Sequence, residues 1–218
     1  MTPRRVAILI SGRGSNMAAL IEAARAPDFP AHINLVVSNR PDAGGLDKAR
    51  LAGIEALVVD HKAYTTREAF EQALDAVLAE RRIELLCLAG FMRVLTPWFV
   101  ERWAGRMLNI HPSLLPLFRG IHTHERALAE GVLVHGCTVH FVVPELDAGP
   151  IVAQAAVQVV PGDTPESLAG RVMVQEHIIY PQALRLICSG AARLAGDRVV
   201  FTASWDGRCV VRSPPPAD

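Results

Sequence analysis

Asn109 and His111 stand two positions apart, just before Pro112, at the end of a short apolar stretch. On an extended chain, residues two apart share one face, so an amide that donates hydrogen bonds stands beside an imidazole that titrates near neutral pH. This pair suits a reaction at a carbonyl carbon, in which one group stabilises the oxyanion and the other moves protons. Alternatively, Asn109 caps the strand and His111 is an ordinary hydrogen-bonded loop histidine.

Asp147 is a third candidate, in the turn Pro144 to Pro150. Aspartate often forms such turns by accepting a hydrogen bond from its own backbone. If Asp147 instead faces His111, its carboxylate favours the imidazolium, which is the acid that the reaction needs at neutral pH. The three residues would then form a catalytic trio.

A glycine-rich turn follows the first predicted strand, Arg5 to Ile10, which is continuously apolar and therefore expected to be buried on both faces. Ser11 to Asn16 leads into a predicted helix, Met17 to Ala26, so its backbone amides lie at a helix N-terminus that attracts anions. A dinucleotide fingerprint needs glycine or alanine at position 17 and an acidic residue after the second strand, but the chain has Met17 and Ser38-Asn39-Arg40. We therefore predict a monophosphate site and not an NAD site.

Three further features could serve a ligand or only the fold. Arg67 lies in the exposed first turn of a predicted helix, where most arginines are only solvated. The apolar segment Phe91 to Leu95 either is covered by a helix at Pro97 to Trp103, which we favour, or lines a pocket for a flat ligand. Glu176 falls at the edge of an apolar helical stripe, where a half-buried carboxylate usually has a partner or a ligand.

Strands and helices alternate along the chain, with further strands expected at Ile33–Ser38, Ala56–Val59, Leu85–Ala89, Met107–Ile110, Gly136–Val143 and Ile151–Val160. Thr65 and Glu68 have capping-box spacing at the start of one helix, and Pro181 should kink the last long helix. This pattern predicts an α/β, Rossmann-like fold with a mostly parallel central sheet of about seven strands and helices on both faces. We expect residues 1–190 to form the catalytic domain, with its N-terminal half binding phosphate and its C-terminal half binding the second substrate and carrying the catalytic residues. Residues 191–218 would add a hairpin, with arms Arg198–Thr202 and Arg208–Val211, and a tail, but no separate domain.

Composition limits the class of partner. The 218 residues include 22 Lys and Arg and 22 Asp and Glu, so no net charge recruits nucleic acid or an anionic membrane. Half of the residues are hydrophobic and the mean hydropathy is +0.24, as in a well-packed globular protein. The four cysteines form no C-x-x-C pair, and His122 and His124 lack a third ligand, so we expect free thiols and no metal. Val6 to Ile10 is too short for a signal sequence or a membrane span, so we expect a cytoplasmic protein.

Several motifs, in order, resemble those of the phosphoribosylglycinamide formyltransferases, which are folate-dependent formyltransferases. They are G-R-G-S-N, L-A-G-F-M-R-V-L, L-N-I-H-P-S-L-L-P, G-I-H-T-H, H-G-C-T-V-H-F-V, E-L-D-A-G-P and Q-E-H, between about residues 5 and 187. The resemblance implies transfer of a formyl group from 10-formyltetrahydrofolate to the amine of 5'-phosphoribosylglycinamide, a step of de novo purine biosynthesis that calls for no metal.

The resemblance also implies a role for each matching residue. The catalytic residues would be Asn109, His111 and Asp147. The phosphate and ribose of the ribonucleotide would be held by Gly14, Ser15, Asn16, Met17, Ala18 and Glu176. The folate would be contacted by Arg67, Met92, Arg93, Val94, Leu95, Asn109, Val143 and Asp147. Ala148 stands where the family often has a second glycine, and Leu117-Phe118-Arg119 also varies from the family pattern.

Three alternatives stay open. Methionyl-tRNA formyltransferase shares the trio, and Arg119-Gly120 resembles its pattern, but it would need a large basic C-terminal domain, whereas only about thirty residues follow Ile187. Formyltetrahydrofolate hydrolase would carry an additional N-terminal domain. A phosphate-binding module that uses Gly12 to Asn16 without catalysis is the alternative of a different class. The sequence is compatible with a monomer or a homodimer.

Overall fold

A seven-stranded sheet forms the centre of the computed structural model, which describes residues 2–202. In order across the sheet, the strands are β3 (Glu55–Val58), β2 (Ala31–Ser38), β1 (Arg4–Ile10), β4 (Leu85–Leu88), β5 (Met107–His111), β6 (Val134–Phe141) and β7 (Ile151–Gln158). The first five run parallel, whereas β6 is antiparallel to both of its neighbours. The predicted mostly parallel sheet of about seven strands is confirmed.

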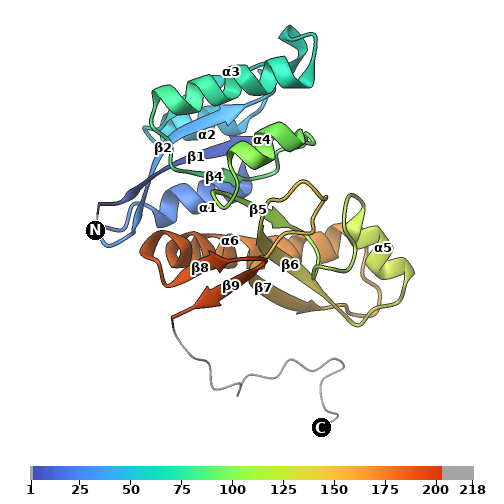
Figure 1. Cartoon of the computed structure of the whole chain (residues 1–218). Helices are drawn as coiled ribbons and strands as arrows, with labels where there is room; N and C mark the ends of the chain where they lie inside the picture. Colours follow the sequence, from blue (N-terminus) through green and yellow to red (C-terminus); the bar gives the residue numbers. More distant parts are fainter. Residues whose placement is uncertain (1, 203–218) are drawn as a thin grey trace.

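Helices cover both faces of this sheet, as predicted (Figure 1). They are α1 (Ser15–Ala23), α2 (Gly45–Leu51), α3 (Arg67–Glu80), α4 (Pro97–Arg102), α5 (Thr123–Ala129) and α6 (Pro165–Ser189), with a 3-10 turn, η1 (His61–Ala63). Val6, Ile8 and Ile10 of β1 belong to the core that α1, α2 and α6 share. Ala7 and Leu9 belong to the core under α3 and α4. Because side chains alternate along a strand, β1 is buried on both faces, which explains its continuously apolar sequence.

The cap of α3 lies one residue later than the capping-box spacing predicted. The helix begins at Arg67, and the side chain of Thr66 accepts a hydrogen bond from the backbone N–H of Ala69 at 3.1 Å. Thr65 and Thr66 carry the same capping hydroxyl, so the position of the helix start decides which of them acts. The predicted box with Thr65 was therefore wrong, although the helix itself is present.

The long helix α6 begins at the Thr164 cap, which forms a capping box with Ser167. Leu168, Val172, Ile179 and Ala183 are all buried, which confirms the predicted apolar stripe. Pro181 lies inside the helix, which continues to Ser189. None of the helices within residues 2–202 has the length and apolar character needed to span a bilayer.

A hairpin that we did not predict lies near the C-terminal end of the described residues. It is formed by β8 (Ala192–Ala195) and β9 (Arg198–Phe201), with Ala195 paired to Arg198. Gly196 has a φ of 63°, which suits glycine in this two-residue turn. The predicted arm Arg198–Thr202 is thus a strand, but its partner precedes it. The predicted arm Arg208–Val211 and the turn Asp206-Gly207 lie outside the described residues.

Candidate active site

Asn109 and His111 project from β5 on the side of the sheet that carries α3 and α4. Their neighbours Leu108 and Ile110 belong to the opposite core, so the two polar residues share one face, as their spacing predicted. His111 is buried and Asn109 is half-buried. The neighbouring parallel strand β4 ends beside Asn109, which pairs with Leu88, so both candidates lie near the carboxyl end of the parallel part of the sheet.

Asp147 reaches this face from the loop between β6 and β7. Its Oδ2 lies 3.4 Å from Nδ1 of His111, and both side chains are buried. The backbone N–H of Gly120 donates to the same oxygen at 2.8 Å, which anchors the carboxyl group from a second loop. Asp147 has a φ of 50°, a left-handed conformation that aspartate tolerates better than most residues. The carboxyl group therefore faces His111, which distinguishes it from an ordinary turn aspartate.

His140, which we did not select from the sequence, links Asn109 to Asp147. Its Nε2 lies 3.2 Å from Nδ2 of Asn109 and 3.8 Å from Oδ1 of Asp147. Its Nδ1 lies 2.9 Å from the carbonyl oxygen of Phe141. Because a carbonyl oxygen only accepts, Nδ1 carries the hydrogen and Nε2 accepts from Asn109. Burial lowers the pKa of His140, opposed by the Phe141 backbone and by Asp147 and reinforced by His111. The neutral ring thus holds the Asn109 amide in one orientation.

The sequence contained one signal for His140, since it lies in the motif H-G-C-T-V-H-F-V and alternates with apolar residues on β6. What the sequence did not supply is the pairing of β5 with β6. The antiparallel register places His140 directly opposite Asn109 and Thr138 directly opposite His111. With that register, His140 necessarily points to the same face as the candidate pair.

The second ring nitrogen of His111 also faces an oxygen atom. Nε2 lies 3.0 Å from the carbonyl oxygen of Phe118, while Nδ1 faces Asp147. Phe118 has a φ of 55°, so the loop after β5 turns this carbonyl back toward the ring through a left-handed residue. A ring with protons on both nitrogens is the form that can donate in both directions.

The glycine-rich turn and Glu176 meet on the other side of the sheet. Asn16 donates from Nδ2 to Oε2 of Glu176 at 2.8 Å, which joins the first turn of α1 to the middle of α6. Glu176 is 9% exposed, and this burial raises its pKa, opposed by Asn16, His177 and His111. The sequence predicted a partner or a ligand for this carboxyl group, and the structure shows that Asn16 is a partner. Oδ1 of Asn16 is buried and has no hydrogen-bond partner among the described residues.

The other residues predicted to bind the ribonucleotide lie in the first turn of α1. Gly14 is the residue before the helix and has a φ of 68°, and Ser15 begins the helix. The backbone N–H groups of the first turn have no partner within a helix, so they are available to a ligand. Met17 has a fully buried side chain, so its backbone alone could contact a ligand. The N–H of Ala18 donates to the carbonyl oxygen of Gly14 at 3.0 Å and is already engaged by the helix.

The segment Phe91–Leu95 combines the two alternatives that we considered for it. A helix does follow, α4, and Phe91 and Leu95 pack against the core under α3 and α4. Met92 and Val94, however, are 74% and 60% exposed, so they are not covered by that helix. Arg93 turns back, with its guanidinium 5.3 Å from the centre of the Phe70 ring.

Arg67 and Val143 complete the predicted folate contacts. Arg67 is exposed at the start of α3, and its side chain makes no recorded hydrogen bond or ion pair with the other described residues. Val143 is half-buried in the loop that carries Asp147. It also lines a cavity of about 280 Å³, together with Val100 of α4 and Leu194 of the hairpin.

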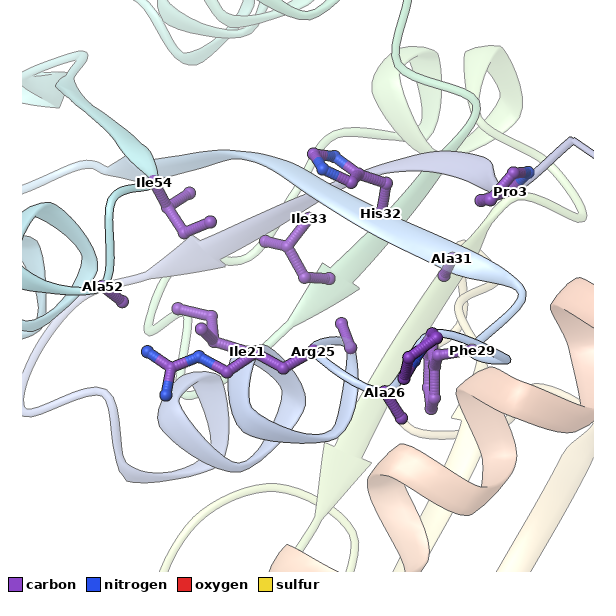
Figure 2. Close-up of a pocket in the computed structure, with 12 residues that line it drawn as sticks. Pro3, Ile21, Arg25, Ala26, Phe29, Ala31, His32, Ile33, Ala52 and Ile54 are labelled. Carbon is purple, nitrogen blue, oxygen red and sulfur yellow. The ribbon is translucent and has the colours of Figure 1, made fainter.

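A second cavity and the histidines His122 and His124 take no part in this site. A cavity of about 390 Å³ is lined by residues such as Ile21, Phe29 and Ala31, at the amino end of β2 (Figure 2). Ligands of open α/β sheets bind at the carboxyl ends of the strands, which is the opposite end. Within residues 2–202, no three His, Cys, Asp or Glu side chains are grouped so that they could hold a metal ion. His122 pairs with Glu125, 3.3 Å between Nδ1 and Oε1.

Comparison with known proteins identifies the family. The family model described as "Formyl transferase" matches residues 4–184. The chain belongs to the formyl transferase family. This confirms the family that the sequence motifs indicated.

Within this family, the chain is similar to proteins of purine biosynthesis. It is 42% identical to the phosphoribosylglycinamide formyltransferase of Escherichia coli, over 96% of this chain and 96% of that protein. It is 55% identical to the trifunctional purine biosynthetic protein adenosine-3 of Bos taurus over 87% of this chain, but spans only 19% of that protein. The crystal structure of glycinamide ribonucleotide transformylase 1 from Symbiobacterium toebii matches with a TM-score of 0.89 and 45% identity, covering 91% of this chain and 94% of that one.

Proposed function

We propose that this protein transfers the formyl group of 10-formyltetrahydrofolate to the amine of 5'-phosphoribosylglycinamide, giving N-formylglycinamide ribonucleotide and tetrahydrofolate. The observation that carries the proposal is the approach of Asp147 to His111, 3.4 Å between Oδ2 and Nδ1, beside an Asn109 amide oriented by His140. This group contains an oxyanion donor and a proton-transfer residue, which are the two functions that acyl transfer requires. The membership of the chain in the formyl transferase family supports the same chemistry.

The reaction follows from the side chains. The substrate amine attacks the formyl carbon, a carbon–nitrogen bond forms, and the carbonyl electron pair moves to oxygen. One N–H of Asn109 is held by His140, so the other N–H of the same amide donates to that oxyanion. The intermediate then collapses as the bond from carbon to the folate nitrogen breaks. The leaving nitrogen takes a proton from His111, and the proton lost by the attacking amine restores the one that His111 gave up.

His111 and Asp147 act together in this scheme. The imidazolium of His111 places positive charge beside the oxyanion and is the source of the proton for the leaving nitrogen. Asp147 supports the cation from Nδ1 and is itself fixed by the N–H of Gly120. Since Nε2 donates to the carbonyl oxygen of Phe118, delivery of its proton requires that hydrogen bond to open.

The two substrates occupy different sides of the trio. The phosphate binds the first-turn amides of α1, from Ser15 to Met17, where the helix dipole favours an anion. Glu176 accepts from the ribose hydroxyls, since its carboxyl group is buried beside that turn. The folate lies against the exposed side chains of the segment 92–95 and the backbone near Val143. Arg67, exposed and without an ion pair among the described residues, suits the anionic glutamate end of the folate.

The test mixes the purified protein with glycinamide ribonucleotide and 10-formyltetrahydrofolate and follows the absorbance of the deformylated folate. We expect release of tetrahydrofolate that depends on the ribonucleotide, and an Asn109→Ala variant slower by about a hundredfold or more. Formylation of methionyl-tRNA would favour the tRNA enzyme, and deformylation without any acceptor would favour the hydrolase. Ribonucleotide binding without an absorbance change would favour the non-catalytic module. The oligomeric state, monomer or homodimer, is a separate measurement by sedimentation.

A further inference from the structure

Two buried polar side chains, from distant parts of the chain, hold the ends of the segment Phe91–Leu95. At its start, the backbone N–H of Met92 donates to Oγ of Ser11 at 2.8 Å. Directly after it, the backbone N–H of Thr96 donates to Oε1 of Glu71 at 2.8 Å, and the Thr96 hydroxyl donates to Oε2 of the same residue. Ser11 is 5% exposed and Glu71 is fully buried.

Glu71 is an unusual choice for its position in α3. Its neighbours Phe70, Leu74 and Leu78 all pack into the core under α3 and α4, and an apolar residue there would also be buried. Burying a carboxyl group is unfavourable unless its oxygen atoms are hydrogen-bonded. Here both oxygen atoms bond to Thr96. The carboxyl group therefore stabilises the position of one backbone segment, which an apolar side chain could not do.

Thr96 carries this constraint into α4. Its Oγ1 also accepts from the backbone N–H of Phe99 at 3.4 Å, which caps the helix. The single hydroxyl thus joins the end of the segment, the start of α4 and the carboxyl group on α3. Loss of the carboxyl group would release the segment and the helix cap together.

Ser11 constrains the other end and belongs to the glycine-rich turn. Its hydroxyl donates to Oδ1 of Asn39 at 2.6 Å while it accepts from Met92, so its orientation is fixed. Its backbone N–H donates to the carbonyl oxygen of Gly90 at 3.2 Å. The start of the segment is therefore bonded to the first residue of the glycine-rich turn, which precedes the proposed phosphate contacts at Ser15 to Met17.

Between these anchors, the side chains of the segment divide into two groups. Arg93 turns toward α3, where its guanidinium lies 5.3 Å from the centre of the Phe70 ring, one residue from Glu71. Met92 and Val94 are 74% and 60% exposed. The backbone of the segment is fixed at both ends, so these two large apolar side chains are held outward in a defined geometry. Such a preorganised surface is suited to bind a ligand.

We propose that Ser11 and Glu71 are positioning residues for the formyl-folate co-substrate. They hold the backbone of the segment so that Met92 and Val94 present a preformed apolar surface to the folate, and they themselves touch no reacting atom. This inference rests on the proposed function, in which the segment contacts the folate. It predicts that both residues affect folate affinity without affecting ribonucleotide affinity.

The experiment measures kcat and the KM of each substrate for Ser11→Ala, Glu71→Leu and Glu71→Gln. We expect the KM for 10-formyltetrahydrofolate to rise about tenfold in Glu71→Leu and several-fold in Ser11→Ala, as for loss of buried hydrogen bonds, with the ribonucleotide KM within twofold. Glu71→Gln should recover most of the loss, because its amide oxygen still accepts from the N–H of Thr96. Calorimetric titration with tetrahydrofolate should reproduce the same order of affinities.

Asp163→Ala is the matched control, because Asp163 has a buried side chain and bonds to backbone and side-chain groups at the start of α6. Asp163→Ala should lower the melting temperature without raising the KM for 10-formyltetrahydrofolate relative to the KM for the ribonucleotide. A second comparison, Val94→Ala, tests the assumed folate contact directly. If Val94→Ala leaves the folate KM unchanged, the proposed folate site is wrong.

If Val94→Ala raises the folate KM but Ser11→Ala and Glu71→Leu do not, the positioning inference is overturned while the folate site stands. An equal rise of both KM values in these variants would also overturn it, because that result indicates a general loss of structure. If Glu71→Leu does not fold, Ser11→Ala and Glu71→Gln provide the test. The inference then stands only if their KM for 10-formyltetrahydrofolate rises while their KM for the ribonucleotide stays within twofold.

Discussion

The hydrogen bond between Asn109 and His140 predicts that mutations of the two residues are coupled. Removing an oxyanion donor typically lowers kcat by about 10² to 10³, so we expect at least a hundredfold loss for Asn109→Ala. We infer that His140 acts by holding the amide, whose Nδ2 lies 3.2 Å from its Nε2. A hydrogen bond between neutral groups contributes about 0.5–1.5 kcal/mol, which corresponds to a factor of roughly two to twelve. We therefore expect His140→Leu to lower kcat by a factor in that range.

The assay is a double-mutant cycle, with kcat measured at saturating concentrations of both substrates. In the Asn109→Ala background, His140→Leu should cost no further activity, because the group that it orients is already absent. His140→Gln should recover most of the wild-type rate, since its amide oxygen can accept from Asn109. Burial lowers the pKa of His140, so the ring is neutral at pH 7 and the coupling should be the same at pH 7 and pH 9. Thermal unfolding of each variant controls for loss of stability.

Additive losses would refute this reasoning. If His140→Leu lowers kcat by the same factor with and without Asn109, then His140 does not act through the amide. Its other neighbour is Asp147, with Oδ1 3.8 Å from Nε2, and that contact would then become the explanation to test.

Three other substitutions test the contacts of Asp147, Glu176 and Gly149. Asp147→Asn keeps an acceptor for the Gly120 N–H but removes the charge 3.4 Å from His111, so kcat at pH 7 should fall at least tenfold with the melting temperature almost unchanged; an unchanged kcat would remove Asp147 from the mechanism. Burial raises the pKa of Glu176, so the stability that this residue contributes is present at low pH and is lost as pH rises through the raised value. The melting temperature of the wild type should therefore fall above pH 4.5, and Glu176→Gln should make this fall smaller. Parallel profiles of melting temperature against pH for the two proteins would contradict the prediction. A Cβ at Gly149 would lie 1.8 Å from the carbonyl oxygen of Phe141, so Gly149→Ala should displace the Asp147 loop and lower both kcat and melting temperature, whereas Gly170→Ala, which meets nothing within 4 Å, should do neither.

Local sequence patterns predicted the order of the elements because each depends on short-range physics. The apolar run of β1, the glycines after it and the stripe of α6 are written in consecutive residues, and all three occur as expected. Where two sites carry the same chemical groups, the sequence alone does not show which of them is used. Thr65 and Thr66 have the same capping hydroxyl. The pairs Gly196-Asp197 and Asp206-Gly207 have the same turn residues on either side of the strand Arg198–Phe201.

The site shows a different limit. Asn109 and His111 could be selected because they are close in sequence. Asp147 could be selected as a turn carboxylate that could face His111, and its motif also resembles that of a known family. His140 was missed because its importance comes from a strand register, Asn109 opposite His140, that no local pattern encodes. Ser11 and Glu71 were missed for the same reason, since their partners Met92 and Thr96 are distant in the sequence and bond through the backbone.

The position of His111 fits the proposal that two substrates approach the site from opposite faces of the sheet. The proposed phosphate turn and Glu176 lie with α1 and α6, whereas Asn109, His140 and Asp147 lie on the face of α3 and α4. His111 is the last residue of β5, where the strand no longer separates these faces, and its Nδ1 lies 3.4 Å from Oδ2 of Asp147. In the proposed function, a ribonucleotide anchored on one face passes its amine around the end of β5 to a formyl group held on the other. Under this proposal the two groups meet at the end of β5, so the loops that carry Asp147 and the segment Phe91–Leu95 set their relative position.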